Sequence, residues 1–449
     1  MKAIQTIFDR VNESKDRPAI FWKNKTYSYA DLLLMIDEWM PLLEKNGIVE
    51  GNVCGFIGDH SPGVYSLIFA LMKAKAIIVP LSREVEINKI DSFKKTAGIE
   101  SLLNFDCNDN WSIVKYKNVK QNDLVGSFIN QKVPGLIVFT SGSTGEPKGI
   151  LHDCEKLMSK FCEERKGWRT VLFLLMDHFG GFNTLLSSFS YRGMAICIPN
   201  RNPDAICEII QQSKATLLPT TPTFINLLIA SRAYQKYDLS SIEIITYGTE
   251  VMPESTLIKV REIFPNAIVK QTYGLSGLGV LRSSSESDDS VWVKVGGQGF
   301  ETKIMDGFLW VRSHSNMIGY LNAPNPINED GWMNTGDQVE VRGDYIRILG
   351  RKSEMINVGG QKVFPVEIET ILLEASNISE ATVFGKEHPV MGQVVEANVT
   401  LNEPENPLEL TERLRKFCMH KMERWKIPLR FNVISKDSQY NERFKKIRI

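Results

Sequence analysis

The sequence has few of the features that mark secreted, metal-binding or membrane-spanning chains. Its seven cysteines are scattered over 449 residues and form neither a CxxC pair nor a metal-ligand spacing, a pattern typical of reduced, mostly buried thiols in a cytoplasmic protein. The opening stretch, "MKAIQTIFDRVNESKD", has no apolar core of a secretory signal. The most apolar stretch begins at Tyr65, carries Lys73 and Lys75, and is too short to cross a bilayer. We therefore expect a cytoplasmic protein without a membrane span.

The chain also lacks net charge. Lysine plus arginine equals aspartate plus glutamate at 53 each, so no overall field attracts nucleic acid or an anionic membrane, and we expect neither as a partner. Hydrophobic residues make up 43% and charged residues 24% of the chain, which is the composition of globular proteins. A chain of 449 residues is too long for one ordinary core, so we expect two or more domains.

Short apolar runs alternate with amphipathic segments over most of the chain. Runs such as 135–139, 194–199 and 215–219 predict buried strands, and "NPDAICEIIQQSK" at 202–214 predicts a helix between two of them. This alternation predicts an α/β protein with layered parallel sheets. From about Val291 the pattern becomes that of a smaller, more antiparallel, barrel-like sheet.

After residue 350 the pattern restarts with a helix at 365–375, a strand at 380–385 and a second helix at 410–422. We place a domain boundary near Gly350 to Ser353. The prediction is a large N-terminal α/β domain over residues 1–350 and a small α+β domain over residues 351–449.

The stretch "FTSGSTGEPKGI", residues 139–150, has the composition of a phosphate-binding loop. Counting from Gly142, Pro147 stands where a P-loop NTPase has its second glycine, and Gly149 stands where it has a metal-binding hydroxyl, so P-loop GTPases and ATPases are disfavoured. The glycines still let backbone N–H groups approach an anion, and Lys148 adds a point charge. The loop follows an apolar strand, as such loops do in α/β sheets. A surface turn is the alternative.

"TSGSTGEPKG" resembles the phosphate loop of the adenylate-forming superfamily, which includes acyl-CoA synthetases, luciferases and peptide-synthetase adenylation domains. Other stretches resemble further motifs of this family in the expected order. They are "YSYADLL" and "AIIVPLS" near the start, "QTYGLSG" at 271–277, "MIGYLNAPNPINEDGWMNTGD" ending at Asp337, and "GRKSEMINVGGQKVFPVEIE" at 350–369. Several motifs in register over nearly the whole chain make the resemblance specific.

The resemblance implies a reaction and its cofactors. Family members join a carboxylic acid to ATP in the presence of Mg²⁺, release pyrophosphate and form an acyl adenylate. Most then pass the acyl group to a thiol, either that of CoA or that of phosphopantetheine on an acyl carrier protein. Because the carboxylate is a weak nucleophile and pyrophosphate carries heavy charge, positioning and fixed positive or hydrogen-bonding groups must supply most of the catalysis.

The same resemblance assigns roles to individual residues. Tyr273 would stack on adenine, Asp337 would accept both ribose hydroxyls with its two oxygens, and Arg351 would lie near the ribose and the hinge of the mobile small domain. Lys148 would act as a catalytic charge, and Thr144 would be a metal ligand. The implied ATP-binding set is Thr140, Ser141, Gly142, Ser143, Thr144, Gly145, Lys148, Gly248, Thr249, Glu250, Tyr273, Gly274, Ser276, Asp337 and Arg351.

The lysine-rich stretch "NERFKKIRI" stands where this family carries a catalytic lysine, which would bridge the substrate carboxylate and the α-phosphate. In this family an arginine stands three residues after the catalytic lysine, as Arg448 does after Lys445. An isoleucine follows that lysine directly, as one does after Lys446. Phe444 replaces the usual glycine, so both lysines are candidates. A solvated basic tail is the alternative.

Two positions depart from the family pattern. Members commonly carry a Mg²⁺-binding glutamate where this chain has Gly277. Loss of one ligand would weaken metal binding without abolishing it, or else the chain is a catalytically impaired nucleotide-binding protein. At the hinge, Ser353 replaces the usual aspartate or lysine, which should be tolerated because a hinge needs backbone freedom more than one side chain.

The segment "MDHFGGFNTLL", residues 176–186, resembles the lining of the family's carboxylate pocket and implies His178, Phe179 and Gly181 as acyl-pocket residues. Asp177 is one residue away from the aspartate that binds the amine in peptide-synthetase domains, so an amino acid is a less favoured substrate. We expect an ATP-dependent acid–thiol ligase. The alternatives are a stand-alone acyl-AMP ligase that loads a carrier protein and the impaired nucleotide binder.

The assignment of the phosphate loop predicts the effect of Lys148→Ala. Loss of the point charge should weaken the use of ATP while the fold stays intact, because an exposed loop lysine has no core to disturb. Adenylation kinetics with ATP as the varied substrate, together with a circular dichroism spectrum, check this. Unchanged kinetics would show that the loop does not bind phosphate.

Overall fold

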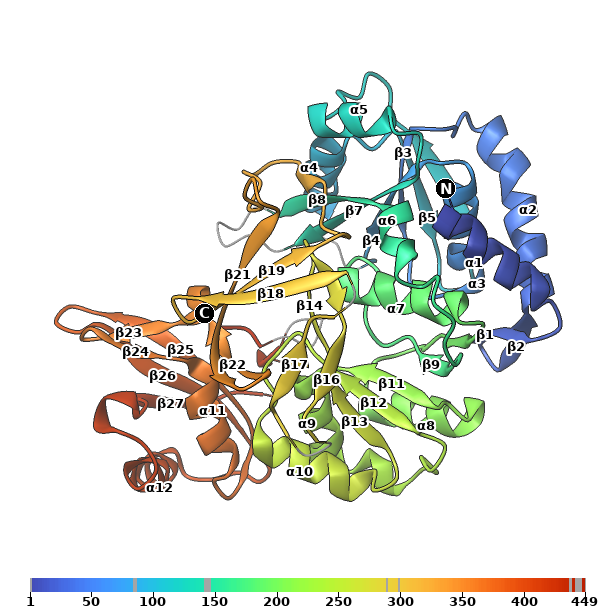
Figure 1. Ribbon diagram of the computed structural model, residues 1–449. Helices are drawn as coiled ribbons and strands as arrows, with labels where there is room; N and C mark the ends of the chain where they lie inside the picture. The colour runs from blue at the N-terminus through green and yellow to red at the C-terminus, as the bar shows by residue number, and fades with distance from the viewer. Residues whose placement is uncertain are drawn as a thin grey trace.

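The computed structural model describes residues 2–83, 87–140, 147–287, 290–297, 299–435, 438–440 and 446–448. Two layered α/β units lie one above the other, an antiparallel sheet lies beside them, and a small C-terminal α+β unit lies at the edge of the molecule (Figure 1). None of the described helices is both long and apolar enough to cross a bilayer.

The first α/β unit is built on a sheet with the strand order β20-β8-β7-β4-β3-β5-β6. The central strands β5, β3, β4 and β7 are parallel, and the outer strands pair with them in antiparallel fashion. The strands are β3 (Val53–Ile57), β4 (Ile77–Leu81), β5 (Ser101–Phe105), β6 (Trp111–Lys115), β7 (Gly135–Thr140), β8 (Lys148–Asp153) and β20 (Gly319–Tyr320). The helices of this part of the chain are α1 (Lys2–Glu13), α2 (Tyr29–Lys45), α3 (Pro62–Lys73), α4 (Ile87–Ala97), α5 (Asp123–Ile129) and α6 (Cys154–Ser159).

The second α/β unit has the strand order β13-β12-β11-β9-β10-β1-β2, and its strands are parallel except for β2 at the edge. Its strands are β1 (Pro18–Trp22), β2 (Lys25–Ser28), β9 (Arg169–Val171), β10 (Met194–Ile196), β11 (Leu217–Thr220), β12 (Ile244–Tyr247) and β13 (Ile268–Gln271). The helical segments are α7 (Phe179–Ser190), α8 (Pro203–Ser213), α9 (Pro222–Ser231), η1 (Ala233–Gln235) and α10 (Glu254–Ile263). Asn202 and Thr221 cap α8 and α9 with their side chains, and a proline follows each cap, which is the usual start of a helix.

An antiparallel region follows, with a hairpin of β14 (Tyr273–Leu275) and β15 (Gly279–Leu281) and a sheet in the order β16-β17-β22-β21-β19-β18. The strands of the sheet are β16 (Ser283–Ser285), β17 (Val293–Val295), β18 (Phe300–Met305), β19 (Phe308–Ser313), β21 (Trp332–Arg342) and β22 (Tyr345–Arg351). The sheet therefore begins at β16, before the predicted start at Val291. Serine has little preference for strands, so the sequence "SSS" gave no signal of β16.

The C-terminal unit has its own sheet and two helices. The sheet has the order β24-β23-β26-β25, and β27 pairs with β26. Its elements are η2 (Lys352–Glu354), β23 (Ile356–Val358), β24 (Gln361–Val363), α11 (Pro365–Leu373), β25 (Ile378–His388), β26 (Gly392–Leu401), α12 (Pro407–Met419), η3 (Arg424–Lys426) and β27 (Arg430–Val433). A hydrophobic core made only of residues 356–431 holds this unit together.

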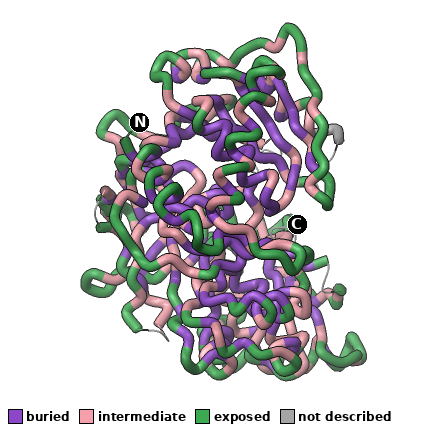
Figure 2. Tube along the Cα trace, turned by 90° about the vertical axis from the view of Figure 1, so that its right-hand side faces the viewer, coloured by how far each residue is buried: buried purple, intermediate pink, exposed green. Residues whose placement is uncertain are grey.

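Buried positions follow the strands and the inner faces of the helices, and exposed positions follow the outer loops (Figure 2). One core cluster contains α3 and also takes in α7 and residues of β1 and β10, so it joins the two units, whereas α8, α9, β11 and β12 form a second cluster. The predicted fold class, a large layered α/β domain followed by a small α+β domain, is confirmed.

Candidate active site

A cavity of about 740 Å³ lies where the two α/β units meet the antiparallel region. Alternate residues of a strand face the same side of a sheet, and Leu217 and Pro219 of β11 both line the cavity. The other walls come from the ends of β7 and β8, the segment after α6, helix α7 and the β14–β15 hairpin. The cavity is therefore assembled from elements that are far apart in the sequence.

Most of the described residues that the sequence predicted as site residues line this cavity. They are Thr140, Lys148, His178, Phe179, Gly248, Thr249, Gly274, Ser276 and Arg351. The structure places Tyr273, Asp337, Glu250, Gly181, Ser353 and Lys446 outside the lining. The predicted residues Ser141, Gly142, Ser143, Thr144, Gly145 and Lys445 lie outside the described part of the chain.

A buried carboxylate joins the predicted base-binding turn to the predicted ribose site. Tyr273 Oη donates to Asp337 Oδ2 at 2.5 Å, and Arg351 Nε donates to Asp337 Oδ1 at 3.0 Å. Tyr273 and Asp337 are only 5% and 4% exposed, so Arg351 is the member of this trio that reaches the cavity. Burial and the nearby Asp337 raise the pKa of Tyr273 well above its usual range, which keeps the phenol protonated as the donor.

The hydrogen bonds of Tyr273 and Arg351 to Asp337 limit how a ribose could bind to this carboxylate. Each carboxylate oxygen of Asp337 accepts one hydrogen bond from this trio and keeps a second acceptor site. Because the carboxylate is buried and lies outside the cavity lining, a ribose can reach it only if neighbouring side chains shift.

The segment around Lys148 is held in place by an asparagine that the sequence analysis did not identify. Asn322 Nδ2 donates to the carbonyl of Pro147 at 3.0 Å, and Asn322 Oδ1 accepts from Gly149 N at 3.1 Å. The Lys148 ammonium lies 5.6 Å from the centre of the Tyr320 ring, within the range of a cation–π contact. The backbone on both sides of Lys148 is thus fixed while its side chain lines the cavity.

The turn that contains Gly277 is held from behind by a neutral histidine. His152 Nε2 lies 2.7 Å from the carbonyl oxygen of Ser276, and because a carbonyl only accepts, Nε2 carries the proton. Burial lowers the pKa of His152 to about 4. A Cβ atom at Gly277 would lie 3.0 Å from Met317 Sδ, part of a flexible side chain that can move aside. Position 277 lines the cavity, and a longer side chain fits there once Met317 moves.

The predicted acyl-pocket residues fall into two groups. His178 lines the cavity and also starts α7, because its Nδ1 accepts from Gly180 N at 3.2 Å as the N-cap. Phe179 lines the cavity beside it. Gly181 has a packing role, since a Cβ atom there would lie 2.0 Å from the carbonyl oxygen of Leu175.

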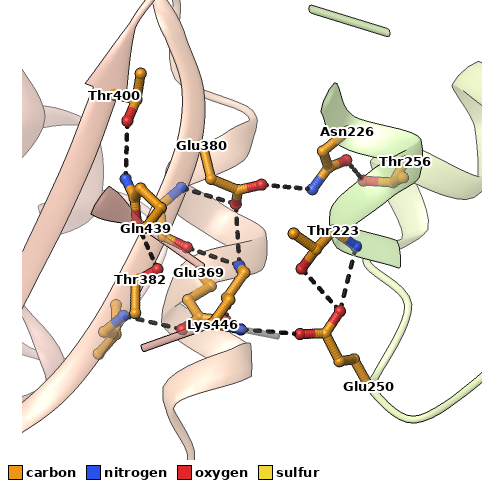
Figure 3. Close-up of polar contacts among 12 residues, drawn as sticks. Thr223, Asn226, Glu250, Thr256, Glu369, Glu380, Thr382, Thr400, Gln439 and Lys446 are labelled. Carbon is orange, nitrogen blue, oxygen red and sulfur yellow. Dashed lines mark hydrogen bonds and ion pairs between the residues drawn. The ribbon is translucent and has the colours of Figure 1, made fainter. Parts of the chain in front are cut away.

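Lys446 lies in a buried ion network between the small C-terminal unit and the second α/β unit (Figure 3). Its ammonium is 3.1 Å from Glu369 Oε2 and 3.1 Å from Glu380 Oε1, and it donates to the carbonyl of Ala381 at 2.7 Å. The Lys446 side chain is 7% exposed and the two glutamates are each 3% exposed. These three acceptors use all three N–H groups of the ammonium.

The same network reaches the second α/β unit. Glu380 Oε2 accepts from Asn226 Nδ2 on α9 at 3.3 Å. Glu250, predicted to lie beside adenine, accepts from Lys446 N at 3.2 Å and from Thr223 Oγ1 at 2.7 Å. Burial raises the pKa of Glu250 although Lys446 and Thr223 act in the opposite direction. Glu250 thus faces the C-terminal segment in this arrangement.

The charges of this network are nearly balanced. Arg448 Nη2 donates to both oxygens of Glu369, at 3.0 and 3.1 Å. Burial acts to raise the pKa of Glu369, but Lys446 and Arg448 outweigh it, and the pKa is lowered. For Lys446 to reach a substrate in the cavity, it must leave this network. The exposed Ser353 lies in η2, between the antiparallel sheet and β23, where such a movement of the small unit would turn.

Basic side chains that the sequence analysis did not single out line the rest of the cavity. They are Lys160, Arg165, Lys270 and Arg282. They come from the segment after α6, from β13 and from the residue after β15, so no local motif could mark them as a group. Lys160, Lys270 and the two arginines face no lining aspartate or glutamate, because none occurs among the described lining residues.

The described residues do not form a metal site. None of them belongs to a group of three or more His, Cys, Asp or Glu side chains that could hold a metal ion. The described cavity lining offers no carboxylate to Mg²⁺, which prefers oxygen ligands, and the predicted ligand Thr144 lies outside the described residues.

Comparisons with known proteins identify the family of the chain. The family model of the AMP-binding enzyme matches residues 7–321, and that of the AMP-binding enzyme C-terminal domain matches residues 367–442. The chain is 26% identical over 435 residues to indoleacetate–CoA ligase from Aromatoleum aromaticum, with 85% of each chain covered. It is 29% identical over 456 residues to 4-coumarate–CoA ligase 1 from Arabidopsis thaliana, with 86% of this chain and 81% of the relative covered.

Solved structures share the fold. The anthranilate CoA ligase AuaEII in complex with anthranoyl-AMP has a TM-score of 0.81 at 18% identity, with 96% of this chain and 93% of that chain covered. ATP-bound MatB from Rhodopseudomonas palustris has a TM-score of 0.81 at 19% identity, with 98% and 96% covered. Because the first family model spans more than half of the sequence, this chain belongs to the AMP-binding enzyme family, and the predicted membership of the adenylate-forming superfamily is confirmed.

The buried network predicts a large effect of Glu369→Gln. The neutral amide leaves Lys446 and Arg448 facing each other without their shared carboxylate, and breaking a buried pair costs about 3 kcal/mol or more. Hydrogen exchange measured by mass spectrometry should show faster exchange in α11 and β25. The control is Glu374→Gln, which removes a surface pair with Lys421 whose side chains are 38% and 41% exposed and should cost less than about 1 kcal/mol. Equal exchange in the two variants would contradict the proposed importance of the network.

The position of Gly277 predicts the effect of Gly277→Glu. A carboxylate there would enter the cavity wall where the described lining has none, so the Mg²⁺ concentration needed for half-maximal pyrophosphate release should fall. Gly277→Gln has the same length without the charge and should leave the Mg²⁺ demand at the wild-type value. If the larger side chain blocks the acid, both variants will lose acid use while ATP still binds. No change in either property would place position 277 outside the site.

Proposed function

We propose that this protein activates a carboxylic acid with ATP and transfers the acyl group to the thiol of CoA. The observation that carries this proposal is the single cavity that Lys148, the turn of Gly248 and Thr249, Arg351 and the start of α7 line together. The curated relatives named above are CoA ligases matched over most of their length, which supports an AMP-forming acid–CoA ligase. The acid itself is not identified by these relatives.

The reaction has two steps. First, an oxygen of the substrate carboxylate attacks the α-phosphorus of ATP, the bond to the oxygen that bridges the α- and β-phosphates breaks, and pyrophosphate leaves. Then the thiol of CoA, having lost its proton, attacks the acyl carbon and AMP leaves. Neither step needs an oxidant or a reductant.

The residues of this chain act on charge and position. Lys148 would stabilise the negative charge that builds up on the leaving pyrophosphate, and such fixed charges are the main source of catalysis in reactions of this kind. Arg351, Asp337 and Tyr273 would hold the nucleoside. His178 and Phe179 would orient the acid against the α-phosphate. This alignment converts a reaction between two solutes into one within a single complex.

Mg²⁺ would have to rest mainly on the phosphates and water. The described lining supplies no carboxylate for it, and the loop residues proposed to approach the phosphates lie outside the described residues. No step of the proposed mechanism is therefore assigned to a protein-bound metal. Because the described lining has no carboxylate for Mg²⁺, a catalytically impaired nucleotide-binding protein is the second candidate function.

The proposed catalytic lysine requires a movement of the small unit. We propose the boundary between residues 350 and 351, with Ser353 as the hinge, because this segment is exposed and leads directly from β22 into the small unit. When the small unit turns, Lys446 leaves Glu369 and Glu380, and either it or Lys445 enters the cavity to bridge the carboxylate and the α-phosphate.

The test is ATP–pyrophosphate exchange over a panel of fatty, aryl and amino acids, followed by a comparison of CoA with a holo carrier protein. Exchange that depends on one class of acid, with formation of its CoA thioester, is the expected result. Transfer only to the carrier protein would favour the acyl-AMP ligase. Binding of ATP without exchange for any acid would favour the impaired nucleotide binder.

The two C-terminal lysines can be separated in the same assay. Lys445→Ala or Lys446→Ala should slow adenylation by on the order of a hundredfold while the affinity for ATP changes little, since the group acts on developing charge. The variant that slows the reaction identifies the catalytic residue. Wild-type rates in both would show that the small unit does not take part in adenylation.

A further inference from the structure

The segment after α6 places a lysine in the cavity without a counter-ion. Lys160 lines the cavity close to α7, which lies between the two α/β units (Figure 1). No described aspartate or glutamate forms an ion pair with it. Its surroundings lower its pKa to about 7, and burial is the cause. An ammonium group in such a place is costly unless another group compensates it.

Lys160 has a hydrogen-bond donor to spare. Its ammonium donates to Asn183 Oδ1 on α7 and to the carbonyl of Val280 on β15 at 3.4 Å. An ammonium has three N–H groups, and two are directed to these neutral acceptors. The centre of the Phe161 ring lies 4.9 Å from the ammonium, and the third N–H group has no acceptor among these contacts, so a ligand in the cavity can accept from it. The Asn183 side chain also lines the cavity, and its amide group can donate to the same ligand.

Further basic side chains line the cavity. They are Arg165, Lys270 and Arg282, and burial together with the charge of Arg165 lowers the pKa of Lys270. Glu163 pairs with both arginines, but it is 53% exposed and does not line the cavity. The partner of these two arginines is therefore a carboxylate at the surface.

Lys160 and the predicted phosphate end belong to different elements of the cavity wall. Asn183 lies on α7 roughly 7 Å along the helix axis from His178, given the rise per residue of an α-helix. The predicted phosphate end, with Thr140 and Lys148, is formed by the ends of β7 and β8.

We propose that the acid activated by this protein carries a second anionic group, and that Lys160 and Asn183 bind this group. The inference rests on the proposed function, because it concerns the acid that enters the cavity. It names the substrate class as a dicarboxylic acid or an acid of equivalent charge. An acid with an amine is disfavoured, since no described carboxylate lines the cavity to receive it.

The test compares matched acids in the full-length protein. The probes are hexanoate with hexanedioate and benzoate with benzene-1,4-dicarboxylate, and the quantity is the ratio of kcat/KM for diacid over monoacid in pyrophosphate exchange. The wild type should favour a diacid at least tenfold in one pair. Lys160→Met should lower this ratio by on the order of 10–100-fold, the usual effect of losing a hydrogen bond to a charged group. Lys160→Arg, which keeps the charge, should restore part of it.

Lys156→Met is the matched control, because Lys156 is an exposed lysine on the neighbouring helix α6. It should keep the wild-type ratio. Thermal unfolding checks that Lys160→Met is folded, and its midpoint should not fall, since the variant removes a charge that burial disfavours. A wild-type preference for the monoacid in every pair, or the same ratio in Lys160→Met and wild type, would overturn the inference.

A binding measurement keeps this result independent of catalysis. Isothermal titration of the diacids in the presence of AMP should show binding that Lys160→Met loses. If no acid supports exchange, the proposed function fails, and the titration alone then decides the inference. Diacid binding that depends on Lys160 would support it, and absence of diacid binding to the wild type would overturn it.

Discussion

Positive charge along the cavity lining, without a carboxylate in the lining itself, is the constraint on which the account of this protein depends. Among the described residues, Lys148, Lys160, Arg165, Lys270, Arg282 and Arg351 line it, and no aspartate or glutamate does. Like charges in a partly desolvated space repel one another more strongly than in water. The cavity is therefore most stable when anions fill it, and a triphosphate at one end and an acid with a second negative group at the other would supply them. An arrangement of this kind also attracts anionic ligands from solution.

At the interface with the small C-terminal unit, in contrast to the cavity, buried positive charges lie next to buried carboxylates. There Lys446 and Arg448 meet Glu369 and Glu380, with hydrogen bonds from Asn226 and Val383, so that the buried charges are paired. Lys446 is thus held by its partners away from the cavity, whereas Lys160 in the cavity has no ion-pair partner among the described residues. Breaking such a network costs several kcal/mol, so the movement that releases Lys446 must gain interactions elsewhere. Ionic interactions between the released Lys446 and the charges of the bound acid and nucleotide would supply this free energy.

The sequence predicted those features that depend on local patterns. Alternating apolar runs predicted the layered α/β fold, and motifs whose residues are close together in the chain predicted Lys148, Gly274, Ser276 and Arg351, which line the cavity. The short serine-rich strand β16 was missed because its residues have weak strand preference. Lys160, Asn183 and Asn322 were missed for another reason. Each of them contacts a partner more than twenty residues away in the chain, such as Val280 for Lys160 or Pro147 for Asn322. A local sequence pattern cannot predict such contacts.

The most direct test of the central claim is a competition between acids. The protein is incubated with ATP, Mg²⁺ and an equimolar mixture of monocarboxylic and dicarboxylic acids of equal length, without a thiol, and the acyl adenylates formed are identified by mass spectrometry. The account predicts that the adenylates carry a free anionic group on the acyl chain. Adenylates of the monocarboxylic acids alone would contradict it, because Lys160 would then bind no anionic group of the acid.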